Sequence, residues 1–395
     1  MDKQQEPRLR FKGFTGAWEE KVLGEILNVR NEFVDSSLYD LDVELENLIS
    51  NSGILVGDTS VRTQTTSLFR KGDILFGRLR PYLNKWWFAE KDGVKSGEIW
   101  ALETSSEYSN FFAYLLVQSR KFLETANITS GTKMPRADWR SLTAITFNFP
   151  SKPEQTHLGL FFRRLDSQIA ESRAVLEKSR QLKKAMLAKM FPANGEKIPK
   201  IRFKGFEGEW ECRKLGIEVE IIGGGTPDTT NSAYWNGDID WYSPTEIGEA
   251  AYANGSVKKI TLLGLQKSSA QILPANRTVL FTSRASIGDM AILTKDGATN
   301  QGFQSFVVGE RLDVYFFYAM GFKIKDYALK NASGSTFLEI SKNTLSQMEF
   351  FAPSLKEQTA IGNFFRQLDE TIALQSAEVE KLNQLKKGLL AAMLV

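Results

Sequence analysis

Two stretches of the chain repeat apolar residues at alternating steps of three and four. In the earlier stretch these residues are Leu158, Phe162, Leu165, Ile169, Leu176 and Leu182, and in the later one Ile361, Phe365, Leu368, Ile372, Val379 and Leu382. A mean step of about 3.5 residues keeps one apolar seam turned toward a partner helix. The spacing therefore predicts two long helices that pack as a coiled coil, each about 57 Å long if it runs for about 38 residues.

Both helices are preceded by the same start signal. Ser151 and Ser354 each stand three residues before a glutamate, in the capping-box pattern S-x-x-E, where the two side chains satisfy free N–H groups of the first turn. Pro153 suits that turn, because its missing N–H would have no partner there. The first helix is expected to end near Pro192 and Gly195.

Polar residues interrupt the seam at Ser172, Ser179 and Gln375. They are compatible with a tolerated imperfection and equally with a device that fixes register or orientation. Two similar helices in one chain, each following a globular segment, can pair antiparallel. Such a pair would give the chain an internal pseudo-twofold axis.

The sequence around the helices also occurs twice. PRLRFKGFTGAWEEKVLG at 7–24 returns as PKIRFKGFEGEWECRKLG at 199–216, an offset of 192 residues. PSKPEQTHLGLFFRRLD opens residues 150–190 and PSLKEQTAIGNFFRQLD opens residues 353–393, an offset of 203. The segments between these repeats diverge, and the second is 11 residues longer. Each half is thus a constant frame around a variable insert.

Each insert is predicted to be an α/β domain. Runs typical of strands at 73–76 and 278–281 lead into polar loops that carry arginine, and an aromatic-rich helix follows around 111–123 and 314–329. The expected architecture is two similar α/β domains, at 1–150 and 193–352, joined by helices at 151–192 and 353–395 that form an antiparallel coiled coil.

Composition narrows the class of protein. A length of 395 residues has room for two or three domains. Cys212 and His157 are the only residues of their types, which excludes an internal disulfide and argues against histidine zinc sites and Ser/His/Asp catalysis. The longest apolar runs are too short to cross a bilayer and the first ten residues contain no signal region, so a cytoplasmic protein is expected. A net charge of +3 permits nucleic-acid binding without arguing for it.

Several catalytic motifs are absent from the sequence. There is no Gly-Lys dipeptide and hence no P-loop. There is no Pro-Pro pair, so the [DNS]-P-P-[YFW] motif of amino-methyltransferases is missing. Pro227-Asp228 is not followed by the (D/E)-x-K element of a nuclease. The sequence therefore predicts a protein that binds rather than catalyses.

Two segments are candidates for binding. Residues 70–85 (RKGDILFGRLRPYLNK) hold five cations and one acid, a net charge of +4. The guanidinium of arginine can donate two hydrogen bonds to guanine or to a phosphate, and lysine commonly binds phosphate. On charge alone, however, a solvated turn is the commoner explanation for such a basic segment. Residues 223–227 (GGGTP) could cradle an anion through backbone N–H groups, although a glycine triplet more often forms a turn. Trp86 and Trp87 are expected to be partly buried rather than platforms for base stacking.

The doubled motifs resemble the specificity (S) subunit of type I restriction–modification systems. The resemblance rests on P-x-x-R-F-x-G-F-x-G-x-W at the start of both halves, GDILFGRLRPYLNK at 72–85, and GGGTP followed by YWNGDIDW at 234–241. It also rests on P-S-x-x-E-Q-T ahead of both helices and Q-L-K-K near both helix ends. Essentially the whole chain is covered.

The resemblance implies a non-catalytic DNA-binding subunit. Each insert would be a target recognition domain that reads one half of a bipartite, asymmetric target in double-stranded DNA. The coiled coil would fix the spacer and dock two modification subunits, which methylate adenine N6 with S-adenosylmethionine. Restriction subunits would add an ATP- and Mg²⁺-dependent translocase and endonuclease. This chain would hold no cofactor or metal and would not contact a membrane.

By correspondence with the family, the DNA-facing residues are expected in the polar loops. In the first half they are Arg78, Arg80, Tyr82, Lys85, Ser130, Thr132, Lys133 and Arg136, and in the second half Thr226, Ser243, Ser283, Arg284, Ser286, Gln301, Gln304, Ser335 and Thr336. Side chains that can make two parallel hydrogen bonds, such as Arg284 or Gln301, would contact base edges. Hydroxyls and lysines would contact phosphates. The alternative is a coiled-coil scaffold whose two heads bind proteins or glycans. A neighbouring gene for a methyltransferase with an N-P-P-[YF] motif would favour the specificity subunit.

Overall fold

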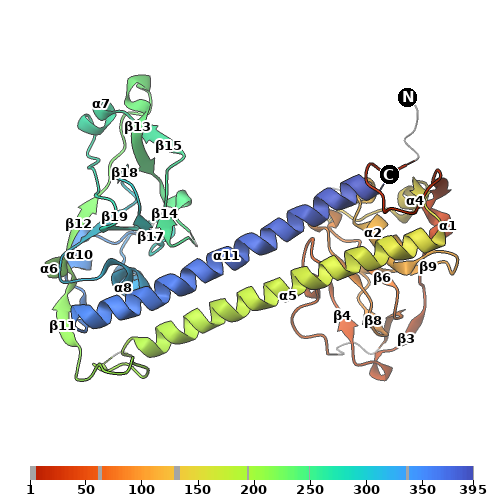
Figure 1. The fold of residues 1–395 in the computed structure, drawn as a ribbon, viewed down its shortest axis with the longest axis horizontal. Coiled ribbons are helices and arrows are strands. Elements are labelled where there is room, and N and C mark those ends of the chain that lie inside the picture. The colour runs from red at the N-terminus through yellow and green to blue at the C-terminus, as the bar shows by residue number, and fades with distance from the viewer. Residues whose placement is uncertain are drawn as a thin grey trace. The chain divides into compact units, whose positions relative to one another are not determined.

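Contacts divide the chain into two compact units in the computed structural model, which describes residues 6–60, 65–128, 134–193, 195–248, 250–334 and 338–394. Unit 1 comprises Met1–Ser172 and Glu378–Val395, and unit 2 comprises Arg173–Ala377. Figure 1 shows two long helices, α5 (Lys152–Met190) and α11 (Leu355–Met393). The boundary between the units falls within each of them. Each unit therefore holds the beginning of one long helix and the end of the other.

The long helices run antiparallel within each unit. In unit 1, Met393 from the end of α11 joins the core that contains Leu158 and Phe162 from the beginning of α5. In unit 2, Met190 from the end of α5 joins the core that contains Ile361 and Phe365 from the beginning of α11. The predicted antiparallel pairing is confirmed, because in both units the end of one helix packs with the beginning of the other.

Unit 1 contains two four-stranded sheets and a two-stranded ribbon. The first sheet has the order β2 (Leu27–Val29), β9 (Ile99–Thr104), β6 (Ile74–Gly77) and β7 (Trp86–Phe88). The second has the order β3 (Phe33–Asp35), β5 (Thr65–Phe69), β8 (Gly93–Lys95) and β4 (Asp42–Val43). The ribbon pairs β1 (Glu19–Val22) with β10 (Thr146–Phe149), which leads directly into α5. The short helices are α1 (Leu23–Ile26), α2 (Asn110–Val117), α3 (Arg120–Ala126) and α4 (Trp139–Thr143), with 3₁₀ turns at Ser36–Leu38, Leu45–Asn47 and Pro81–Leu83.

Unit 2 is built from the same parts. Its larger sheet has the order β12 (Val219–Gly223), β19 (Gln304–Val308), β16 (Thr278–Phe281), β17 (Met290–Leu293) and β14 (Tyr252–Ala253). Its second sheet has the order β15 (Lys258–Ile260), β13 (Trp235–Tyr242) and β18 (Gly297–Thr299), and its ribbon pairs β11 (Glu211–Lys214) with β20 (Glu349–Ala352). The short helices are α6 (Leu215–Glu218), α7 (Leu262–Gln266), α8 (Val314–Ala319), α9 (Gly321–Asn331) and α10 (Lys342–Ser346), with 3₁₀ turns at Ser232–Tyr234 and Pro244–Glu246.

The shared topology confirms two α/β domains of one fold. In both units an antiparallel core of corresponding strands, β2-β9-β6-β7 and β12-β19-β16-β17, lies in the larger sheet. A parallel pair, β4 with β8 or β13 with β18, lies in the second sheet. The aromatic-rich helix predicted in each insert is instead two helices. In unit 1 the break falls at Ser119, whose hydroxyl accepts from Phe122 N and caps α3.

The predicted seam is only partly regular. Of its residues, those buried are Leu158, Phe162, Leu165, Ile169, Leu176, Ile361 and Phe365, and those half-buried are Leu368, Ile372, Val379 and Leu382. Leu182 departs from the seam, because its side chain is 49% exposed. The neighbouring Lys183 is half-buried instead and its ammonium lies 2.5 Å from Asp369 Oδ1. The strict heptad count therefore fails near the end of α5.

The glutamates of the predicted capping boxes bind arginines instead of the helix starts. Arg10 Nε and Nη2 lie 2.7 Å from the two carboxylate oxygens of Glu154. Arg202 makes the same pair of 2.7 Å contacts with Glu357. Each arginine also donates to a glycine carbonyl at 2.6 Å, in the segment that precedes its insert. In both halves of the chain the same ion pair therefore connects the segment before the insert to the start of the long helix.

Candidate nucleic-acid interface

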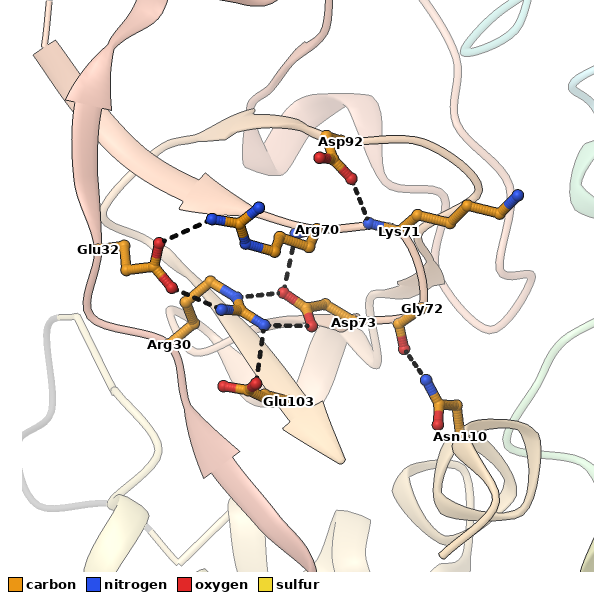
Figure 2. Close-up of polar contacts among 9 residues, drawn as sticks. All are labelled: Arg30, Glu32, Arg70, Lys71, Gly72, Asp73, Asp92, Glu103 and Asn110. Atoms are coloured by element: carbon orange, nitrogen blue, oxygen red, sulfur yellow. Dashed lines mark hydrogen bonds and ion pairs between the residues drawn. The ribbon is translucent and has the colours of Figure 1, made fainter. Parts of the chain in front are cut away.

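The basic run at 70–85 is divided by strand β6 into two parts with different environments. Arg30 binds Asp73 at the start of the strand, with Nε 2.7 Å from Oδ2 and Nη2 3.1 Å from Oδ1. The same guanidinium lies 2.6 Å from Glu32 Oε1 and 3.2 Å from Glu103 Oε1, and Figure 2 marks both ion pairs. Arg70 lies 3.2 Å from Glu32 (Figure 2), so its charge is used within the unit.

This network fixes the loop that enters β6. Hydrogen bonding to Asp73 raises the pKa of Arg30 above its ordinary value, against the opposing effect of burial. The backbone N–H of Lys71 donates to Asp92, and Asn110 donates to the carbonyl of Gly72 (Figure 2). Residues 70–73 therefore serve the fold, and the candidate interface lies beyond the other end of the strand.

Arg78, Arg80 and Arg136 are brought together beyond the end of β6. Arg80 N donates to the carbonyl of Pro135 at 2.8 Å, and Ala137 N donates to the carbonyl of Arg78 at 2.9 Å. Arg78 N donates to the carbonyl of Glu98 at 2.9 Å, and Arg136 Nη2 lies 2.8 Å from Glu98 Oε1. Loops distant in the sequence therefore form one basic surface with an acid at its centre.

The remaining predicted residues of this surface differ in exposure. Arg80 is exposed and has left-handed backbone geometry, with φ 50°. Tyr82 is 57% exposed in the 3₁₀ turn that follows. Lys85 donates its ammonium to the carbonyl of Leu45 at 2.8 Å, so that charge stabilises the unit. Trp86 belongs to the core, as expected.

Three buried polar atoms in or beside this surface lack hydrogen-bond partners among the described residues. Within the ranges that the structure describes, Arg78 Nε, Ser96 Oγ and Glu98 Oε2 are buried and make no hydrogen bond. Lys95 lies on the adjoining strand β8, and burial, aided by the charge of Arg78, lowers the pKa of its ammonium to about 8. Lys95 and Glu98 were not predicted from the sequence, because no motif or spacing near them distinguishes them from other charged residues.

Unit 2 repeats the backbone of this site with other side chains. Ser283 N donates to the carbonyl of Gly302 at 2.8 Å, and Ile340 N donates to the carbonyl of Ser283 at 3.0 Å. Ser283 thus makes the backbone contacts that Arg78 makes in unit 1. One residue later, Arg284 forms an antiparallel bridge with Glu339, as Leu79 does with Arg136.

The equivalence of Arg136 and Glu339 was open to prediction. They are 203 residues apart, the offset of the second sequence repeat. Each also precedes by two residues the side chain that caps the next short helix, Asp138 for α4 and Ser341 for α10. The offset identifies the position, whereas the side chains there have opposite charges.

Other predicted residues of unit 2 are engaged within the unit. Thr226 donates its hydroxyl to Gln301 Oε1. Ser243 Oγ donates to Glu246 Oε2 at 2.7 Å and caps a 3₁₀ turn. The carbonyl of Ser286, whose residue is exposed, accepts the hydroxyl of Thr282.

Two further predicted residues carry buried polar atoms. Gln304 Oε1 and Ser283 Oγ have no hydrogen-bond partner in the described part of unit 2. Ser130, Thr132, Lys133, Ser335 and Thr336 lie outside the described residues.

The glycine triplet at 223–225 is packed against the unit's own backbone. A Cβ on Gly224 would lie 1.9 Å from the carbonyl oxygen of Asn300, and one on Gly225 would lie 2.4 Å from Ala270 N. Gly225 N donates to Thr299 and its carbonyl accepts from Trp241 Nε1, both at 2.8 Å. The triplet therefore allows close packing, and the anion cradle considered from the sequence does not form.

Candidate membrane spans and metal sites are absent from the described ranges. No helix there is both long and apolar enough to cross a membrane. No group of three or more His, Cys, Asp or Glu side chains there is placed to hold a metal ion. Cys212 is exposed and free.

Comparison with known proteins identifies the type of domain. Residues 207–384 match the type I restriction modification DNA specificity domain. The chain is 33% identical over 193 residues to the type I restriction enzyme MjaIX specificity subunit of Methanocaldococcus jannaschii, a match that spans 48% of this chain and 43% of that protein. It is 20% identical to the HindI specificity subunit of Haemophilus influenzae over 95% of this chain and 98% of that one.

Solved structures share the fold across the whole chain. A crystal structure of the S subunit of a type I restriction–modification system from M. genitalium superposes with a TM-score of 0.65 at 15% identity, covering 99% of both chains. A chain from a study of complex assembly in a type I R-M system superposes with a TM-score of 0.55 at 18% identity, covering 96% of this chain and 98% of that one.

Proposed function

We infer that this chain, which belongs to the type I restriction enzyme specificity subunits, confers DNA sequence specificity on a restriction–modification complex. Specificity subunits are non-catalytic, and the catalytic activities of these systems lie in other subunits. Each target recognition domain, at 1–150 and 193–352, reads one half of a bipartite target in double-stranded DNA.

One observation carries this proposal. The two units hold equivalent backbone positions with the same hydrogen bonds, but those positions bear Arg78 and Arg136 in unit 1 and Ser283 and Glu339 in unit 2. Side chains that differ in charge on a constant frame recognise different groups. The proposed target is therefore asymmetric, with unlike half-sites.

The repeated frame supports a second part of the proposal. The ion pairs of Arg10 with Glu154 and of Arg202 with Glu357 have the same geometry at the two helix starts. Two copies of one surface suit two copies of one partner, so we propose that the frame docks two modification subunits, with restriction subunits added in the full enzyme. S-adenosylmethionine, ATP and Mg²⁺ would be held by those partners.

The helices are proposed to set the spacer between half-sites. Half-sites read from one face of DNA lie about one helical turn apart, roughly 34–36 Å. Insertion of one heptad into both α5 and α11, in register, would lengthen the spacer that the complex accepts. An unchanged spacer in a methylation assay would contradict this role.

The proposed function is tested with the purified complex of this chain and its modification subunit. Selection from a library of random duplexes at physiological salt should recover one bipartite sequence, because base contacts add to the salt-dependent binding of phosphates. Methylome sequencing of the host should report the same sequence. Equal binding to all duplexes would refute the proposal.

A further inference from the structure

Arg284 and Glu339 form an isolated antiparallel bridge in unit 2, just beyond the end of β16. Residues opposite one another in such a pair project their side chains to the same face, with Cβ atoms about 5 Å apart. The position of Glu339 is fixed independently of its side chain, because its N–H and carbonyl both bond to Ser333 at 3.0 Å. Ala285, with φ 62°, reverses the chain immediately after Arg284.

Neither side chain serves the fold of unit 2. Among the described residues, the side chains of Arg284 and Glu339 have no hydrogen-bond or ion-pair partner, and they do not pair with each other. Glu339 is exposed and Arg284 is half-buried. The two segments are joined by a neighbouring backbone bond, from Ile340 N to the carbonyl of Ser283 at 3.0 Å, so the side chains of Arg284 and Glu339 are left available for a ligand.

The two groups together match one kind of base pair. A guanidinium fork donates two hydrogen bonds to O6 and N7 of guanine, and a carboxylate accepts from the N4 amino group of cytosine. An A·T pair offers a guanidinium no such pair of acceptors, and a carboxylate beside thymine O4 would be repelled. A guanidinium and a carboxylate that lie side by side therefore favour a G·C pair.

Unit 1 has a different arrangement at the equivalent positions. There Leu79 and Arg136 form the bridge, and Arg136 is paired with Glu98 at 2.8 Å. The bridge in unit 2 thus combines a guanidinium and a carboxylate that are both unpaired among the described residues, whereas the corresponding bridge of unit 1 does not.

We propose that Arg284 and Glu339 determine specificity by reading a single G·C pair in the half-site bound by unit 2. The proposal rests on the proposed function and makes it more specific. Arg284 was predicted as a base reader from the sequence; Glu339 as its partner, and the base pair, come from the geometry.

The test compares variants of the complete complex with the modification subunit by selection from random duplexes. Arg284→Ala and Glu339→Gln should each lower the preference for G·C over A·T at one position of one half-site, roughly 10- to 100-fold. Preferences in the other half-site should stay as in the wild type. Glu339→Gln retains the shape of the side chain, so it stays informative if Arg284→Ala folds poorly, and thermal melting records the folding of both.

Glu310→Gln is the matched control, because Glu310 is an exposed acid of the same unit outside the bridge. It removes the same charge and should leave every preference unchanged. An unaltered profile for Glu339→Gln, or an equal loss on all sequences, would overturn the proposal while leaving the proposed function intact. A wild-type complex without any sequence preference would instead refute the proposed function.

Discussion

Lys386 Nζ lies 2.6 Å from Asp166 Oδ1, which joins the end of α11 to the beginning of α5 within unit 1. The same ammonium lies 2.6 Å from Gln118 Oε1. Unit 2 contains the reciprocal contact, in which Lys183 lies 2.5 Å from Asp369. Both residues of one pair are 203 positions from those of the other, so the same interaction occurs in both copies of the repeat, with the two helices exchanging roles.

Replacing Lys386 by methionine should destabilise the protein. The pair is largely shielded, with 11% of the lysine and 27% of the aspartate side chain exposed, so the variant would remove an ion pair from a poorly solvated site. We expect a loss of about 1–3 kcal/mol in the free energy of unfolding, measured by urea denaturation. Lys387→Met, an exposed position on the same helix, should cost far less. Equal losses in the two variants would contradict a specific role for the pair.

Replacing Arg30 by methionine should have a larger effect. The Asp73 carboxylate would keep its bond from Arg70 N at 2.9 Å but would lose its buried counter-ion. Breaking a buried pair from one side costs about 3–5 kcal/mol, which urea unfolding would detect. The control is Lys71→Met, which removes an exposed ammonium from the same loop. A loss below about 1 kcal/mol for Arg30→Met would show that the pair is dispensable.

Arg10→Met and Arg202→Met should destabilise the protein by similar amounts. Both arginines are mostly buried, with side-chain exposures of 15% and 14%, and each partner glutamate is 2% exposed. We expect about 3 kcal/mol for each, because an unpaired carboxylate would remain buried.

Lys12→Met and Lys204→Met supply the matched controls for this pair of substitutions. They remove exposed charges two residues after each arginine, at positions related by the same offset of 192. Markedly unequal losses from the two arginine variants would show that the repeated frame is not energetically equivalent in its two copies.

Replacing Lys95 by methionine should change how stability depends on pH. Burial lowers the pKa of Lys95 from 10.5 to about 8, so between these values the unfolded chain binds a proton that the folded chain lacks. The contribution of Lys95 to stability therefore rises with pH across that window, and below about pH 8 the cost of burying its charge is fully present.

Lys95→Met should accordingly be more stable than the wild type at pH 7, by about 1–3 kcal/mol, with an advantage that shrinks toward pH 10. Melting temperatures of both proteins, recorded from pH 7 to about pH 10, would measure the difference. The exposed Lys91→Met provides the reference for alkaline effects elsewhere. A difference that is constant with pH would contradict the lowered pKa.

The sequence by itself determined the parts of the protein that follow from local periodicity and from repetition. The 3.5-residue spacing identified α5 and α11, the repeats identified two domains of one fold, and strand runs identified β6 and β16 nearly to the residue. Such patterns are visible because helix and strand periods depend on neighbouring residues. The offset of 203 also separates Arg136 from Glu339, a correspondence that the sequence contains but that we did not predict from it.

Only the tertiary structure decided which charges are used internally and which are available. Glu154 fits a cap by sequence but binds Arg10, and Arg70 belongs to a basic run but binds Glu32. Nothing in the local sequence distinguishes Glu339. Only its bridge to Arg284 places its carboxylate beside a guanidinium. The physical reason is that ion pairs and bridges join residues tens to hundreds of positions apart, whose proximity is set by strand pairing and packing and leaves no trace in local periodicity.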